Sequence, residues 1–167
     1  MHDELTEVDI RKMKEELEYR EKVLQPKILE DVKVARGFGD LSENFEYKSA
    51  KQEKIKNESR MRYLRNMIST AVVISAAPQG EGVNLFDTVE VWFEEDEEAQ
   101  EVTIVTTLRQ NALNGIISNK SPLGKALLGH KVGERVKVEV SEDYSYYVEI
   151  RSIRKGKDDD SLDISSF

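Results

Sequence analysis

Apolar residues recur at helical spacing through the first 70 residues of the chain. Between residues 47 and 68 they follow alternating steps of three and four, which is the heptad pattern of a coiled coil. The members of this stripe are Tyr47, Ala50, Lys54, Asn57, Met61, Leu64 and Ile68. An earlier stripe consists of Met13, Leu17, Leu24, Ile28 and Ala35. The two stripes predict two long helices that pack along one seam, with a weaker polar middle at Lys54 and Asn57.

Glycine and proline positions set the ends of these helices. Of the nine glycines, only Gly37 and Gly39 precede residue 80. We therefore expect helices over residues 8–36 and 41–69, joined by a turn at residues 37–39. Because so short a turn makes the helices antiparallel, the pattern predicts a coiled-coil hairpin. Pro26 lacks a backbone donor and should kink or loosen the first helix.

The second half of the chain changes period. Short β-branched or aromatic runs at residues 72–74, 88–93, 101–108, 132–140 and 144–153 predict strands. One helix interrupts them: Ser121 suits its N-cap, Pro122 its first position and Gly129 its end. The expected fold class is α+β, with the helical hairpin followed by a small antiparallel β-sheet domain that carries one helix.

This reading divides the chain into three parts. Residues 1–76 form the coiled coil, with an acidic tip at residues 37–46. Residues 77–155 form the globular domain. Residues 156–167 are rich in Asp and Ser, and we expect them to be a disordered acidic tail.

Composition excludes several classes of protein. The 167 residues contain no cysteine and only two histidines, so disulfide scaffolds, thiolate metal sites and cysteine nucleophiles are excluded, and a reducing cytoplasm is the expected location. No apolar run is long enough to span a membrane. The net charge of −8 argues against a free-standing duplex-binding protein. All of this excess lies after residue 77, which suggests a basic protein surface as the partner.

Two acids at the tip are candidates for chemistry. Asp40 and Glu43 lie three apart at the start of the predicted second helix, so both carboxylates would lie on one side of its end. Such a pair can hold a hard cation such as Mg²⁺, weakly unless a partner completes the ligands. The same spacing also fits a capping box, in which Asp40 is the N-cap and Glu43 the third helical residue. Spacing alone leaves both interpretations open.

The tip sequence Gly39-Asp40-Leu41-Ser42-Glu43-Asn44-x-Glu46-Tyr47 resembles the motif of the bacterial transcript cleavage factors of the GreA/GreB family. A second block resembles the C-terminal signature of that family. It comprises Ile117-Ser118, residues 121–129 (SPLGKALLG) and Lys131-Val132-Gly133. The resemblance spans about residues 8–155 and implies an FKBP-like fold for the globular domain.

The resemblance also implies a mechanism. Members of the family bind RNA polymerase through the C-terminal domain, insert the coiled coil into the secondary channel and stimulate cleavage of a backtracked RNA 3′ end. By position, Asp40 and Glu43 would hold a Mg²⁺ shared with the polymerase, weakly or not at all in the isolated protein. Ser42 would orient water or RNA, and Ser121, Pro122 and Leu123 fall in the block expected to bind polymerase. The chain would be a cytoplasmic, monomeric accessory factor rather than an enzyme.

A basic stripe beside the seam has two interpretations. Lys48, Lys51, Arg62 and Arg65 fall within an arc of roughly 100° on the second helix. They could guide the RNA 3′ segment through phosphate contacts, as the family resemblance suggests, or they could form a solvated helix face.

Three classes of function remain open at the level of sequence. The first is the polymerase accessory factor, and the second is a coiled-coil adapter or a related paralogue that binds polymerase without stimulating cleavage. The third is a free enzyme such as a prolyl isomerase, which the FKBP-like fold suggests. Phe45 and Phe38 depart from the family pattern, as does the segment at residues 106–114, and each could redirect the activity.

Overall fold

The computed structural model describes residues 2–39 and 43–166. These residues form two compact units, one of residues 10–71 and one that joins residues 2–9 to residues 72–166. Strand β1 (Glu4–Leu5) pairs in parallel with β2 (Val72–Val73), which places the start of the chain in the second unit. The structural boundary therefore differs from the predicted one at residue 76.

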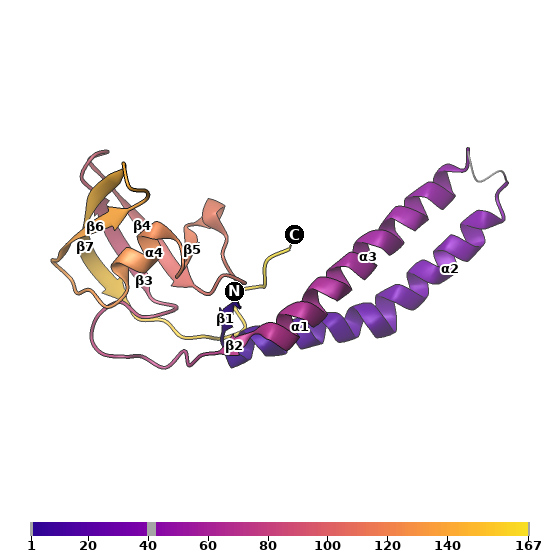
Figure 1. The fold of residues 1–167 in the computed structure, drawn as a ribbon, viewed down its shortest axis with the longest axis horizontal. Helices are drawn as coiled ribbons and strands as arrows, with labels where there is room; N and C mark the ends of the chain where they lie inside the picture. The colour runs from indigo at the N-terminus through magenta and orange to yellow at the C-terminus, as the bar shows by residue number, and fades with distance from the viewer. Residues whose placement is uncertain (1, 40–42, 167) are drawn as a thin grey trace. The chain divides into compact units, whose positions relative to one another are not determined.

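The first unit is the predicted antiparallel helical hairpin (Figure 1). Its first arm consists of α1 (Glu7–Tyr19), a π-helical segment η1 (Arg20–Leu24) and α2 (Gln25–Arg36). Its second arm is the single helix α3 (Phe45–Thr70). The backbone N–H of Gln25 donates to the carbonyl of Arg20, five residues back, which is the π pattern. The predicted disturbance near Pro26 is this π segment, because the proline ring removes a donor and crowds the preceding turn.

Apolar side chains are buried at both ends of the seam. Met13 and Leu64, far from the turn, are fully buried, and Ile28, Val32 and Ala35, nearer the turn, are nearly so. Lys54, by contrast, is only half-buried. The weaker part of the seam is therefore its polar middle, as the sequence predicts.

The middle of the hairpin contains a polar layer. Asn57, only 2% exposed, accepts a hydrogen bond from Arg20 Nη1 at 2.8 Å and donates to Gln25 Oε1 at 2.8 Å. Beside it, Arg60 donates to both carboxylate oxygens of Glu16, at 2.6 and 3.1 Å. Burial alone would raise the pKa of Glu16, but hydrogen bonds and charge from Arg60 and Arg20 hold that pKa below its ordinary value. The buried polar side chains in the middle of the seam therefore have hydrogen-bond partners on the opposite arm.

The second unit contains a five-stranded sheet in the order β5-β4-β3-β7-β6. Its strands are β3 (Thr88–Phe93), β4 (Glu98–Val105), β5 (Ile116–Ser118), β6 (Arg135–Glu139) and β7 (Ser145–Arg154). All pairs are antiparallel except β4 with β5, so the prediction of a purely antiparallel sheet was wrong at this edge. Residues 106–115, which include the short helix η2 (Ala112–Asn114), bring the chain back so that β5 runs alongside β4.

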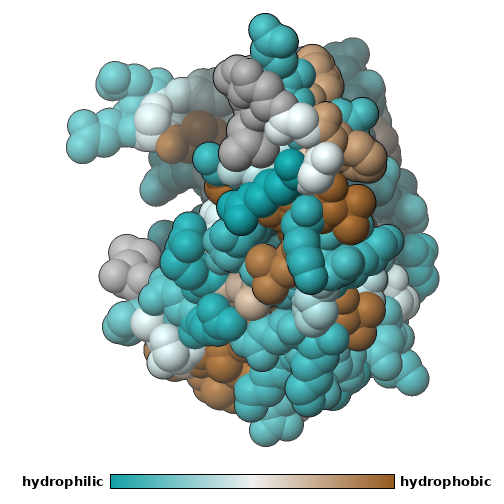
Figure 2. Space-filling view, turned by 90° about the vertical axis from the view of Figure 1, so that its right-hand side faces the viewer, coloured by the Kyte–Doolittle hydropathy of each residue, from teal (hydrophilic) through white to brown (hydrophobic). Residues whose placement is uncertain are grey.

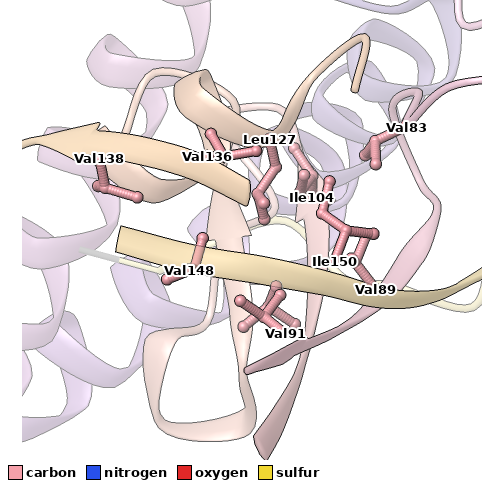
Figure 3. Close-up of a cluster of buried hydrophobic side chains, with 10 residues drawn as sticks. Val83, Val89, Val91, Ile104, Leu127, Val136, Val138, Val148 and Ile150 are labelled. Atoms are coloured by element: carbon pink, nitrogen blue, oxygen red, sulfur yellow. The ribbon is translucent and has the colours of Figure 1, made fainter. Parts of the chain in front are cut away.

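The core lies on one face of this sheet (Figure 3). Alternate residues of the strands point into it, including Val89 and Val91 of β3 and Val148 and Ile150 of β7. Helix α4 (Pro122–Leu127) contributes the fully buried Leu127. As predicted, Ser121 is its N-cap, with Oγ accepting from the N–H of Gly124 at 3.1 Å.

The C-terminal segment packs against the same unit. Arg109 is 2% exposed, its Nε lies 2.6 Å from Asp9 Oδ1, and its guanidinium also pairs with Asp158. Further along, the N–H of Ser165 donates to the carbonyl of Leu108 at 2.6 Å. Residues 156–166, which we expected to be disordered, thus have defined partners, because a buried arginine needs their carboxylate.

No helix within the described ranges is both long enough and apolar enough to cross a membrane.

Candidate functional site

The end of the hairpin is built around Asn44. Helix α2 ends at Arg36, with Gly37 as its C-cap, and Asn44 is the N-cap of α3. The Asn44 side chain accepts from the N–H of Tyr47 at 3.0 Å and donates to the carbonyl of Ala35 at 2.5 Å. Asn44 is only 6% exposed. One side chain therefore caps α3 and joins its start to the end of α2.

The predicted start of the second helix was wrong. We placed it at Leu41, with Asp40 as the cap, whereas α3 begins at Phe45. Asn is as good an N-cap as Asp, so the sequence offered two candidates four residues apart. Glu43 consequently precedes the helix, in a turn, and helical spacing no longer argues that Asp40 and Glu43 share a side. Asp40 and Ser42 lie outside the described residues.

Glu43 remains suitable for binding a cation. Its side chain is exposed, and it forms no hydrogen bond or ion pair with any other residue that the structure describes. No group of three or more His, Cys, Asp or Glu that could hold a metal occurs among residues 2–39 and 43–166. The described carboxylate alone would therefore bind a divalent cation weakly, and the remaining ligands must come from elsewhere.

Aromatic side chains surround the same end of the hairpin. Phe38 is 67% exposed and Phe45 is 82% exposed. The guanidinium of Arg36 lies over the ring of Tyr47, 5.7 Å from its centroid, and links the last residue of α2 to the first turn of α3. The tip thus combines a fixed backbone with exposed aromatic surface.

All four residues of the predicted basic stripe are exposed on α3. Arg65 forms an ion pair across the hairpin, with Nη2 2.6 Å from Glu21 Oε1. For Lys48, Lys51 and Arg62, the described part of the chain shows no ion pair. The stripe therefore divides into three lysine and arginine side chains directed to solvent and one that also braces the hairpin.

The three residues predicted to contact polymerase have different environments. Ser121 caps α4, and its Oγ also donates to the carbonyl of Ser118 at 2.6 Å. Leu123 packs against the core, while Pro122 is exposed. A Cβ on the following residue, Gly124, would lie 2.2 Å from the carbonyl oxygen of Ser118. Ser121 and Leu123 therefore have structural roles, and Pro122 is the exposed one of the three.

Two important residues escaped the sequence reasoning. Asn44 appears in the tip motif, but Asp40 was the only cap candidate considered; an Asn directly before a helical run was the available signal. Arg109 lies in the segment at residues 106–114, which was noted only as a departure from the family pattern, yet its side chain is fully buried between Asp9 and Asp158. No local sequence pattern predicts the ion pair between Asp9 and Arg109, which lie 100 positions apart in the chain.

Comparisons with known proteins agree with the motifs. A family model described as "Transcription elongation factor, N-terminal" matches residues 4–73, and one described as "Transcription elongation factor, GreA/GreB, C-term" matches residues 78–155. The transcription elongation factor GreA of Caldanaerobacter subterraneus subsp. tengcongensis is 44% identical over 137 residues, which are 81% of this chain and 87% of that relative. The factor of the same name from Geobacillus kaustophilus is 41% identical over 136 residues, covering 81% of this chain and 86% of the relative.

Solved structures show weaker likeness. The GreA factor homolog 1 protein of Thermus thermophilus matches with 25% identity and a TM-score of 0.44, covering 93% of this chain and 100% of its own. The GreA/GreB elongation factor of Nitrosomonas europaea matches with 22% identity and a TM-score of 0.38, covering 57% of this chain and 79% of its own.

Proposed function

We infer the activity of this chain from one premise: it belongs to the GreA/GreB family of transcription elongation factors. We propose that it binds RNA polymerase, inserts the end of its hairpin into the secondary channel and stimulates the polymerase's own cleavage of backtracked RNA 3′ ends. The protein is then an accessory factor, and the polymerase is the enzyme.

The observation that carries this proposal is the position of the tip motif. The described part of the motif is Gly39, which follows α2, and residues 43–47, which lead into the first turn of α3, so both of its sides lie where the two arms of the hairpin end. Glu43 is exposed there, and the clamp at Asn44 fixes the backbone directly after it. A carboxylate so placed can reach a reactive centre inside another molecule without carrying a complete site of its own.

Asp40 and Glu43 are the residues proposed to hold a Mg²⁺ shared with the polymerase, and Ser42 is proposed to orient water or RNA. When bound, the cation polarises water and neutralises charge on the phosphate being cleaved. The chain's own contribution is to place two carboxylates and keep them there. Lys48, Lys51 and Arg62 lie on the same helix as the tip and offer contacts to RNA phosphates.

The globular unit is proposed to bind the polymerase. Residues 78–167 carry 18 acids and 10 bases, a net charge of −8, which suits a basic partner surface. Pro122 and Leu123, at the start of α4, belong to the block that resembles the family signature.

The test is cleavage of end-labelled RNA in stalled, backtracked complexes, with and without the purified protein. We expect rapid shortening of the RNA with wild type, and loss of at least about 100-fold in rate with Asp40→Asn or Glu43→Gln, because metal-ion stabilisation of this kind supplies several kcal/mol and each 1.4 kcal/mol is tenfold. Glu53→Gln is the matched control, since Glu53 is an exposed carboxylate of α3 beyond the tip.

Three outcomes contradict the proposal in different ways. Polymerase binding without stimulated cleavage identifies a binding factor, the second class considered from the sequence. Cleavage that survives both tip substitutions removes the proposed role of the carboxylates. Turnover of an X-Pro peptide by the purified chain favours the isomerase instead.

A further inference from the structure

Phe45 occupies an unusual position for a large apolar side chain. It is the first residue of α3 and is 82% exposed, while the neighbouring Asn44 is buried. Fully burying a phenylalanine is favourable by roughly 1.5–3 kcal/mol, so leaving it in water forgoes that stabilisation. The surface seen in Figure 2 is mostly hydrophilic, with separate apolar patches. An exposed ring at the functional end of the hairpin therefore calls for a partner.

The ring is attached to a rigid backbone. Asn44 donates to the carbonyl of Ala35 and accepts from the N–H of Tyr47, so the residues on both sides of Phe45 are fixed. Arg36 over Tyr47 adds a second link between the two helices. Because the backbone at Phe45 is already fixed, less conformational entropy is lost when the ring contacts a partner.

The two cations that follow Phe45 along α3 indicate the chemistry of that partner, since the exposed Glu46 lies about 100° around the helix on the other side. Lys48 lies three residues along the helix, on the neighbouring surface, and Lys51 lies one further turn away; both are exposed. An aromatic face followed by cations along one path is the arrangement by which proteins hold single-stranded nucleic acid, with bases on the ring and phosphates on the lysines. An apolar wall of a protein channel would have no use for the two lysines.

We propose that Phe45 stacks on an unpaired base of the displaced RNA 3′ segment, with Lys48 and Lys51 against the adjoining phosphates. This inference rests on the proposed function and gives the tip a second role, since it holds the substrate as well as supplying carboxylates. Phe45 adds a binding contact and takes no part in bond breaking. Stacking depends on the flat π-face, so another aromatic residue can replace Phe45 and an aliphatic one cannot.

The experiment compares two variants and two RNAs with the full-length protein. Phe45→Tyr keeps the ring, and Phe45→Leu keeps apolar surface without a π-face. The backtracked complexes carry either a normal base or an abasic nucleotide at the displaced 3′ position. Stacking is worth about 1–3 kcal/mol per base. We therefore expect wild type and Phe45→Tyr, at limiting protein, to cleave the complex with the base about tenfold faster than the abasic one, and Phe45→Leu to cleave both at one rate.

Ile55→Ala is the matched control, because Ile55 is another exposed apolar residue of α3. It should keep the tenfold preference for the base. A preference that persists in Phe45→Leu overturns the proposal, because a group other than the ring of Phe45 would then contact the base. Equal rates on the two RNAs with wild type overturn it as well.

A second measurement separates this inference from the proposed function. A photoreactive 4-thiouridine at the RNA 3′ end reports contact whether or not cleavage is stimulated. We expect a crosslink to the peptide containing Phe45 in wild type and Phe45→Tyr, and at least a fivefold weaker one in Phe45→Leu. An absent crosslink, or one equal in all three proteins, overturns the stacking proposal even where Asp40→Asn abolishes cleavage as the proposed function requires.

Discussion

Asn44 shows how a single side chain shapes the end of the hairpin at which α3 begins. Its two hydrogen bonds cap α3 and satisfy a buried carbonyl of α2. Loss of an N-cap costs about 1 kcal/mol. Loss of the hydrogen bond to the Ala35 carbonyl, which still accepts from the N–H of Phe38 at 3.1 Å, costs about 0.5–1.5 kcal/mol more. We expect Asn44→Ala to lower the free energy of unfolding by about 1.5–2.5 kcal/mol in urea denaturation followed by circular dichroism. Asn66→Ala, at an exposed position of the same helix, should cost nothing measurable, and equal losses would contradict the capping role.

Arg109 is the clearest case of a residue whose role depends on distant partners. Its guanidinium lies between two carboxylates, Asp9 and Asp158, and its Nη1 donates to the carbonyl of Asp159 at 3.0 Å. Removing one partner from a buried ion pair costs about 3–5 kcal/mol, because the remaining charge is left uncompensated. Arg109→Met should lower the unfolding free energy by that amount.

The matched control for Arg109 is Arg154→Met. Arg154 pairs with Glu101 at 3.3 Å, but both side chains are more than 60% exposed, and such pairs contribute about 0–1 kcal/mol. Similar losses in the two variants, measured by urea denaturation, would show that the network around Arg109 is not a stabilising one.

At the scale of the element, the π segment explains a shift in the seam of the first arm. Met13, Leu17 and Leu24 continue one heptad register, which would next place Lys27, Asp31 and Val34 against α3. Those three are exposed, and the buried residues are Ile28, Val32 and Ala35, each one position later. A π turn contains one residue more than an α turn, so η1 absorbs the shift.

A deletion tests this account. Removing Val23, an exposed residue within η1, should convert the segment to α-helix, keep both halves of the seam in phase and leave stability within about 1 kcal/mol of wild type. Removing Leu29, an exposed residue of α2, takes Val32 and Ala35 out of the seam if η1 stays π-helical, and takes Ile28 out if η1 becomes α-helical. In both cases it should cost at least about 2 kcal/mol, since each large buried side chain lost costs about 2–5 kcal/mol. Equal losses in thermal denaturation would sink the register argument.

The elements also show what the sequence could and could not predict. The two helices, the glycine turn and the Ser121-Pro122 start of α4 follow from local signals and were predicted to within a few residues. The register shift was visible in the sequence, because Leu24, Ile28 and Val32 are spaced by four and four, but Val32 was not included in the predicted stripe. β5 was missed since three residues carry too little periodicity to predict a strand.

For the whole molecule, the two units were visible where glycine becomes frequent, but their membership was not. Glu4 pairs with Val72, and Asp9 pairs with Arg109. Such pairings form because the folded chain buries these residues together. Composition alone predicts that the first residues are solvent-exposed and that the last residues are disordered. At the tip, the sequence showed the motif. The capping role of Asn44 and the exposure of the Phe45 ring became apparent only from the structure.

The C-terminal segment gives a prediction at this scale. Ending the chain at Lys155 removes Asp158 from Arg109 and removes the hydrogen bond from Ser165 to Leu108. We expect a loss of about 3 kcal/mol in the second unit, followed by the fluorescence of Trp92, the only tryptophan of the chain. The helical signal in circular dichroism should report the hairpin and change less.

Combining the truncation with Arg109→Met tests whether the segment acts through that arginine. Both changes break one network, so the double variant should lose about 1–3 kcal/mol less than the sum of the single losses, as residues in one network do. Additive losses, or a truncation that leaves the Trp92 transition unchanged, would mean that residues 156–166 contribute little to the fold. A loss in the double variant that is smaller than the sum of the single losses means instead that three segments unfold together. These are the start of the chain, the loop after β4 and the C-terminal segment, which all contact the one buried guanidinium of Arg109.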